Sequence, residues 1–134
     1  MGTKINNLTG NMKLLTYFCH METVSVSTGK TLYKTTIHAG DHVLISDEPL
    51  EHGGKDEGAT PSELLLASLG ACTAITLRMY ANRKAWPLEK VEINLSIQKD
   101  MENGVLTTTI SREISVEGDL TVEQRQRLLT IANA

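Results

Sequence analysis

The first half of the chain alternates apolar and polar residues in a way that is typical of short β-strands. Val24 and Val26 fall on one face, and turns at Thr28-Gly29 and Gly40-Asp41 interrupt the alternation. We therefore predict three short antiparallel strands, from Thr23 to the first turn, from Leu32 to Ile37 and from His42 to Ser46. Residues 47–59 contain one proline and three glycines and are predicted to form a loop.

A helix start is the clearest local signal in the sequence. Thr60-Pro61-Ser62-Glu63 combines an N-cap threonine, a proline at the first helical position and a glutamate three residues after the cap. The helix is predicted to end near residues 83–84, before Pro87. Residues 64–77 carry no charge, and apolar residues surround the helix axis. We therefore expect this helix to be buried on most sides.

The remainder of the chain predicts a β-hairpin followed by a second helix. Apolar residues alternate strictly with polar ones at Val91, Ile93, Leu95 and Ile97. Asn103-Gly104 is a strong hairpin turn, and residues 105–116 return as a long second strand. Thr121 and Gln124 have the spacing of another capping box, which places the last helix after Gly118.

These elements predict an α+β domain whose helices gather against antiparallel sheets. Five strands are too few to enclose the long apolar helix on all sides, so we predict that a second copy completes its burial in a homodimer. Residues 1–20 lack a sustained period and are interpreted as a poorly ordered extension. The domain itself is predicted to span residues 21–134.

Composition and charge narrow the function classes. The 134 residues include 13 Lys and Arg against 16 Asp and Glu, and this net charge of −3 argues against nucleic-acid binding. No run of roughly 18 uncharged apolar residues is present, and the N-terminus has no secretory core, so we expect neither membrane insertion nor export. Cys19 and Cys72 are then expected to be reduced thiols of a cytoplasmic protein.

Cys72 is the candidate nucleophile. On an ideal helix its face also carries Leu65, Ser68, Leu69, Ile75, Thr76 and Met79. A buried cysteine can pack there simply as a small hydrophobe. A reactive thiol requires a nearby cation, and this face of the helix supplies none, so the cation must come from elsewhere in the fold.

Arg112 and Lys30 are the candidate cations. Arg112 has the same strand parity as its apolar neighbours, and an unpaired guanidinium is costly on an apolar face. Its partner is predicted to be a thiolate or a structural carboxylate, unless the side chain reaches out to water at the strand's end. Lys30 follows the first turn and is either a second cation for the thiol or simply solvated.

Glu63 and the histidines complete the candidates. Glu63 lies about half a turn around the helix from Cys72, so its role as the N3 cap competes with any catalytic role. His38, His42 and His52 offer ligands in principle, but they match no recognised zinc spacing. No metal and no other cofactor are predicted.

The stretch from Gly53 to Trp86, GGKDEGATPSELLLASLGACTAITLRMYANRKAW, resembles the segment around the first cysteine of the OsmC/Ohr proteins. The shared motif is a Gly-rich loop, a Thr-Pro helix start and a cysteine eleven residues after the proline. The segment 110–134, ISREISVEGDLTVEQRQRLLTIANA, is similar to that family's late strand and terminal helix.

The resemblance implies an interlocked homodimer with two long central helices, and a peroxidase that reduces organic hydroperoxides in oxidative-stress defence. Cys72 matches the peroxidatic cysteine, which becomes a sulfenic acid and is then captured by a second thiol. Arg112, Lys30 and Glu63 are the residues predicted to assist it. A dithiol is the expected reductant. The alternative is a non-catalytic dimer that binds a small hydrophobic ligand.

The sequence also departs from the family's pattern. The family's second cysteine stands in a Cys-Pro pair after the terminal helix, whereas this sequence ends at Ala134. The resolving thiol is then expected either in a longer parent chain or in an outside dithiol, because Cys19 matches no family position. The Ohr branch has a glutamate directly after the helix-starting proline, where this chain has Ser62, and an arginine where it has Lys30.

Overall fold

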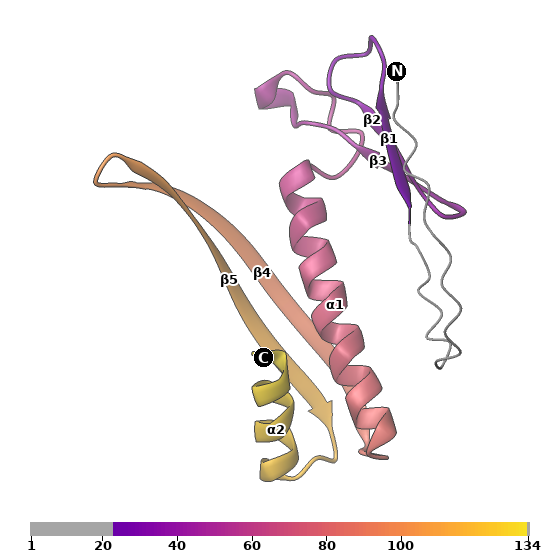
Figure 1. The fold of residues 1–134 in the computed structure, drawn as a ribbon, viewed down its shortest axis with the longest axis vertical. Coiled ribbons are helices and arrows are strands. Elements are labelled where there is room, and N and C mark those ends of the chain that lie inside the picture. The colour runs from indigo at the N-terminus through magenta and orange to yellow at the C-terminus, as the bar shows by residue number, and fades with distance from the viewer. Residues whose placement is uncertain (1–22, 134) are drawn as a thin grey trace, which may run out of the picture.

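The computed structural model describes residues 23–133, which form five strands, two α-helices and one short 3₁₀-helix (Figure 1). In chain order these are β1 (Val24–Thr28), β2 (Thr35–Ala39), β3 (His42–Ser46), η1 (Leu50–His52), α1 (Pro61–Arg83), β4 (Leu88–Glu102), β5 (Val105–Gly118) and α2 (Val122–Ala132). The predicted α+β class and the order of its elements are confirmed. The predicted extension 1–20 and its Cys19 lie outside the described residues.

The strands form two separate antiparallel sheets. One has three strands in the order β1-β2-β3, and the other is the long β4-β5 hairpin. Figure 1 shows α1 running alongside the hairpin, with α2 beside the C-terminal half of α1 and the three-stranded sheet near its N-terminal end. The packing contacts of α1 are with β4 and α2, and the three-stranded sheet adds few contacts to the rest of the chain.

Both predicted capping boxes are present. At α1 the backbone N–H of Thr60 donates to Glu63 Oε2 over 2.7 Å, and the N–H of Glu63 donates to Thr60 Oγ1 over 3.2 Å. At α2 Thr121 and Gln124 exchange the same pair of bonds over 2.9 and 3.2 Å. These side chains satisfy N–H groups that would otherwise lack partners, so each helix begins at the predicted residue.

The strand boundaries differ from the prediction most clearly at the starts of β2 and β4. β2 begins at Thr35 rather than at Leu32, because Leu32 has a φ of 43° and belongs to the preceding turn. β4 begins at Leu88, earlier than its alternation suggests, and a β-bulge follows between Leu88 and Lys90. The predicted Asn103-Gly104 turn is confirmed, with both residues at positive φ.

The core of the described chain lies at the end of the molecule where α1, β4 and α2 meet. Its buried apolar residues are Leu77, Ala81, Leu88, Leu120 and Leu128. Trp86 packs edge-on against Tyr80, with ring centroids 5.4 Å apart, at the rim of this cluster. The C-terminal half of α1 is therefore anchored, while its N-terminal half has little cover from its own chain.

Within the single chain α1 is not buried on most sides, which agrees with the expectation that its own strands are too few to enclose it. Only Thr73, Leu77 and Ala81 are buried in α1. Four large apolar residues of the helix are instead exposed, namely Leu65 (54%), Leu69 (38%), Ile75 (59%) and Met79 (59%). The apolar residues do surround the helix axis as predicted, but the described chain leaves much of these four side chains uncovered.

Pro61–Arg83 is long and apolar enough by length and composition to cross a membrane, although its uncharged stretch is limited to residues 64–77, as the sequence analysis found, and only a small part of the helix is buried. The central helix of a soluble oligomer has the same composition, so this observation does not separate the two environments.

Candidate functional site

Cys72 lies on the side of α1 that faces away from the β4-β5 hairpin. Thr73, Leu77 and Ala81 are the buried residues of α1, and Cys72 is turned about 100° from Thr73 around the axis. The Cys72 side chain is exposed. Its predicted neighbours on this surface, which we call the Cys72 face, are also exposed, namely Leu65, Ser68, Leu69, Ile75, Thr76 and Met79.

Arg112 occupies the predicted inward face of β5, where it is half-buried. Its Nη1 donates to Thr73 Oγ1 over 3.2 Å, and its Nη2 donates to the carbonyl of Ala132 over 2.7 Å and to Asn133 Oδ1 over 2.9 Å. Within residues 23–133 the guanidinium therefore pairs with neutral oxygens and not with a thiolate or a carboxylate, the first two of the three predicted alternatives. One of these oxygens is a carbonyl at the C-terminus of α2, where the helix dipole favours a positive charge.

Lys30 is exposed in the loop between β1 and β2. A second lysine from the same loop, Lys34, forms an ion pair with Glu57. The hydrogen bond to Glu57, followed by the charge of that carboxylate, raises the pKa of Lys34. Sequence reasoning did not single out Lys34, because its partner lies in a loop whose path no periodic pattern predicts.

Glu63 is engaged by its own helix start. The backbone N–H of Thr60 and then the Thr60 hydroxyl donate to the Glu63 carboxylate and lower its pKa. These contacts are those of the N3 cap. The structure describes no bond between Glu63 and Cys72.

Asp47 is a buried carboxylate that the sequence analysis did not identify. Its two oxygens accept backbone N–H groups from Glu48 over 2.9 Å, Lys55 over 3.1 Å and Glu57 over 3.3 Å. Burial by itself would raise the pKa of Asp47, but these three bonds and the charge of Lys34 outweigh it and lower the pKa. Asp47 therefore holds loop 47–59 in place and, through Glu57, the ion pair to Lys34.

A cleft of about 520 Å³ opens between the three-stranded sheet and the start of α1. Its lining includes the apolar side chains Val26, Leu32, Tyr33, Ile37, Pro61 and Leu64. Pro61 and Cys72 are eleven residues apart, close to three full turns, so they share one side of α1 at about 16 Å along the axis. The cleft and the sulfur thus lie along the same side of the helix, although Cys72 does not line the cleft.

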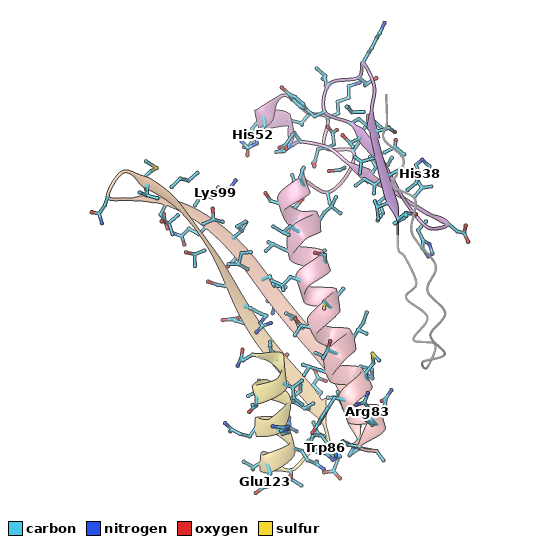
Figure 2. All side chains as sticks on the ribbon, in the orientation of Figure 1. His38, His52, Arg83, Trp86, Lys99 and Glu123 are labelled. Atoms are coloured by element: carbon cyan, nitrogen blue, oxygen red, sulfur yellow. The ribbon has the colours of Figure 1, made fainter. Side chains whose placement is uncertain are left out.

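The histidines do not converge in the described part of the chain. His38 and His42 point to opposite faces of the three-stranded sheet, since paired β2 and β3 residues alternate. Figure 2 shows His52 on the other side of this sheet from His38. Within residues 23–133 no three His, Cys, Asp or Glu side chains are grouped as metal ligands.

The structure therefore separates the four predicted site residues. Within residues 23–133, none of Arg112, Lys30 and Glu63 forms a hydrogen bond with Cys72, and each has a different environment. A single chain presents an exposed thiol on an apolar helix face, with a cleft farther along that face.

This fold and the cysteine-bearing helix define the class of protein. The chain belongs to the family of OsmC-like proteins, whose family model matches residues 54–134. That match includes α1 with Cys72, the β4-β5 hairpin and α2. No curated protein matches the sequence.

Solved structures with the same fold carry names from this family. An OsmC-like protein from Mycoplasma pneumoniae has a TM-score of 0.72 at 14% identity, and the alignment covers 86% of this chain and 82% of that one. An organic hydroperoxide resistance protein OsmC from Legionella pneumophila has a TM-score of 0.63 at 19% identity, covering 85% and 82%. An organic hydroperoxide resistance protein from Elizabethkingia anophelis has a TM-score of 0.63 at 21% identity, covering 90% and 84%. At these identities the likeness establishes the fold.

Proposed function

We propose that this OsmC-like protein is a cysteine-based hydroperoxide reductase that acts as a cytoplasmic homodimer, with Cys72 as its nucleophile. The observation that carries the proposal is the exposed thiol on the Cys72 face, within the segment that the family model matches. Structural neighbours from Legionella pneumophila and Elizabethkingia anophelis bear the name organic hydroperoxide resistance protein, which agrees with this chemistry.

The homodimer is supported by the apolar surface that one chain leaves uncovered. Besides the Cys72 face, the sheet face that carries Val24, Val26 and Leu44 is exposed, and so are Val105 and Leu106 near the hairpin turn. Soluble proteins rarely leave apolar surface of this extent in contact with water. A second copy related by two-fold symmetry would cover these surfaces with matching apolar surfaces of its own.

The dimer also offers a source for the cation that thiolate chemistry requires. Arg112 is committed to Thr73 and to the end of α2, and Glu63 to its own cap. Lys30 is exposed in the loop between β1 and β2 and is available to approach the Cys72 face of a second copy. We therefore assign Lys30 as the candidate cation, acting between subunits.

In the proposed reaction, the Cys72 thiolate attacks the terminal peroxide oxygen of ROOH. The O–O bond breaks, the S–O bond of a sulfenic acid forms, and the leaving alkoxide takes a proton and departs as ROH. One thiol of an external dithiol then attacks the sulfenic sulfur and releases water. The second thiol displaces Cys72 from this mixed disulfide, which restores the enzyme and leaves the dithiol oxidised.

The test is reduction of tert-butyl hydroperoxide or cumene hydroperoxide with a dithiol reductant. Cys72→Ser should abolish turnover, because serine cannot supply a thiolate. Cys19→Ser is the matched control, since it removes the other thiol of the chain, and it should retain the rate. Equal rates for the wild type and Cys72→Ser would remove Cys72 from the mechanism.

The cleft beside α1 favours one alternative, a non-catalytic dimer that binds a small hydrophobic ligand. Its volume of about 520 Å³ falls in the usual range for ligand pockets, and its lining is mainly apolar. In this alternative Cys72 only packs in the dimer interface. Its thiol should then resist labelling until the protein unfolds, whereas the proposed reductase should be labelled in the native state.

A further inference from the structure

Cys72 lies between two points at which α1 is held on the β4-β5 hairpin. At one of them, Gly70 faces Leu95 so closely that a methyl group at Gly70 would come within 2.9 Å of Leu95 Cδ1. At the other, Thr73 accepts the hydrogen bond from Arg112. Leu95 and Arg112 are direct cross-strand partners, so both contacts belong to one crossing of the helix over the hairpin.

The hydroxyl of Thr73 connects Arg112 to the backbone of α1. Thr73 is buried, and its Oγ1 donates to the carbonyl of Leu69 over 2.9 Å while it accepts from Arg112 Nη1 over 3.2 Å. The guanidinium is thus linked through one hydroxyl to the helical turn that precedes Cys72. A rotation of this turn about the helix axis would break the link.

The same guanidinium also holds the end of α2. Its Nη2 donates to Ala132 O and to Asn133 Oδ1, the final residues of the described chain. Arg112 therefore joins three elements, namely β5, the Cys72-bearing turn of α1 and the C-terminus of α2. Because a guanidinium presents its donors in a fixed planar fork, its contacts to α1 and α2 are geometrically coupled.

We propose that Arg112 is a positioning residue for Cys72. It acts through Thr73 to fix the rotation of α1 at the turn that carries the sulfur, and it links that turn to the C-terminal end of α2. This inference rests on the proposed function for its catalytic consequence. The hold of Arg112 on α1 through Thr73 is itself a property of the fold and is measurable without turnover.

Arg125 provides a matched control for Arg112. It is also a half-buried arginine that bridges α2 and β5, and it donates to the carbonyls of Val116 and Gly118, both over 2.8 Å. It has no described contact with the Cys72-bearing turn. Arg125 holds the first turn of α2, whereas Arg112 contacts its last residues, so loss of Arg125 should loosen the start of α2 and leave the orientation of Cys72 unchanged.

The experiment compares Arg112→Gln, Thr73→Val, their double variant and Arg125→Gln in the full-length protein. The readouts are the second-order rate of Cys72 with tert-butyl hydroperoxide and backbone hydrogen exchange of residues 70–76. Arg112→Gln and Thr73→Val should each slow the peroxide reaction about tenfold and speed this exchange. Thr73→Ser should recover most of the rate, because it keeps the hydroxyl.

The double variant decides whether Arg112 acts through Thr73. If it does, the double variant should be no slower than the slower single variant, whereas independent effects would multiply. Multiplied effects overturn the proposal, as does an Arg125→Gln variant that slows the reaction as much as Arg112→Gln. If the wild type shows no peroxide reaction, the proposed function fails. The hydrogen exchange of residues 70–76 would then still decide whether Arg112 holds this turn through Thr73. Non-additive effects of Arg112→Gln and Thr73→Val on this exchange, with no effect of Arg125→Gln, would support it. Additive effects would overturn it.

Discussion

The apolar side of α1 gives the sharpest test of the dimer. Its four large residues, Leu65, Leu69, Ile75 and Met79, each expose between 38% and 59% of their surface. Together they leave uncovered about as much apolar surface as two whole side chains. At about 1.5–3 kcal/mol for each buried side chain, covering them contributes roughly 3–6 kcal/mol per subunit to association.

Ile75→Glu is the perturbation that we expect to break this interface. Ile75 is 59% exposed, so each copy loses about 1–2 kcal/mol of burial, and two-fold symmetry doubles the loss in the dimer. This corresponds to a rise in the dimer dissociation constant of about 30- to 1,000-fold, before any cost of placing a carboxylate in the interface. The fold of the single chain should survive, because Ile75 is exposed in it.

Sedimentation velocity over a range of protein concentrations measures this dissociation constant directly. The control is Val122→Glu, since Val122 is 77% exposed and begins α2, where a negative charge is favourable. The reasoning is refuted if Ile75→Glu dissociates at the same concentration as the wild type. It is equally refuted if Val122→Glu weakens the dimer as much as Ile75→Glu.

Three further substitutions test the stability of the single chain. Leu77→Ala should lower the free energy of unfolding by about 2–5 kcal/mol in urea denaturation, because Leu77 is fully buried, and a loss below 1 kcal/mol would contradict the core described above. Asp47→Asn should destabilise the protein at neutral pH and flatten its acid unfolding curve. Because the pKa of Asp47 is lowered in the folded state, its carboxylate stabilises the fold fully above the unfolded aspartate pKa of about 3.9. This stabilisation is lost as the pH falls through the folded-state pKa. Parallel acid unfolding curves for the variant and the wild type would argue against this role. Gly54→Ala should lower the melting temperature more than Gly29→Ala. A Cβ at Gly54 would overlap the carbonyl of Glu48, whereas Gly29 faces open space. Equal shifts in melting temperature would show that the loop adapts.

The parts of the fold that the sequence predicted well are those with local causes. The two helix starts follow from side chains that bond their own backbone within three residues. The hairpin turn follows from Asn103-Gly104, whose positive φ values few other residue pairs accept. Such signals depend on neighbours in sequence, and the structure confirms them.

The features that were mispredicted or missed depend on distant parts of the chain. Strand parity correctly placed Arg112 on the inward face of β5, but its partners come from α1 and from the end of α2. The burial of Asp47 depends on a loop that folds back over it. The single chain covers only the side of α1 that carries Thr73, Leu77 and Ala81, and the apolar pattern by itself does not show which surface covers the rest.

Whether the thiol and its cation belong to different subunits can be decided by mixing two inactive variants. We expect Lys30→Met to lose most of the activity while retaining Cys72, and Cys72→Ser to retain Lys30. If Lys30 acts between subunits, a heterodimer of the two variants contains one complete site, formed by Cys72 of one chain and Lys30 of the other. Random reassociation makes about half of the dimers heterodimers, so peroxidase activity should return to about a quarter of the wild-type level.

If Lys30 acts within its own chain, no dimer of the mixture contains a complete site, and activity stays at the level of the separate variants. Full activity of Lys30→Met alone would instead remove Lys30 as the cation. We expect this recovery because, in one chain, Arg112 has no described bond to Cys72, and Lys30 is exposed in the loop between β1 and β2. Since Cys72 lies on a side of α1 that its own chain leaves exposed, we expect the subunit that covers this side to supply the cation as well.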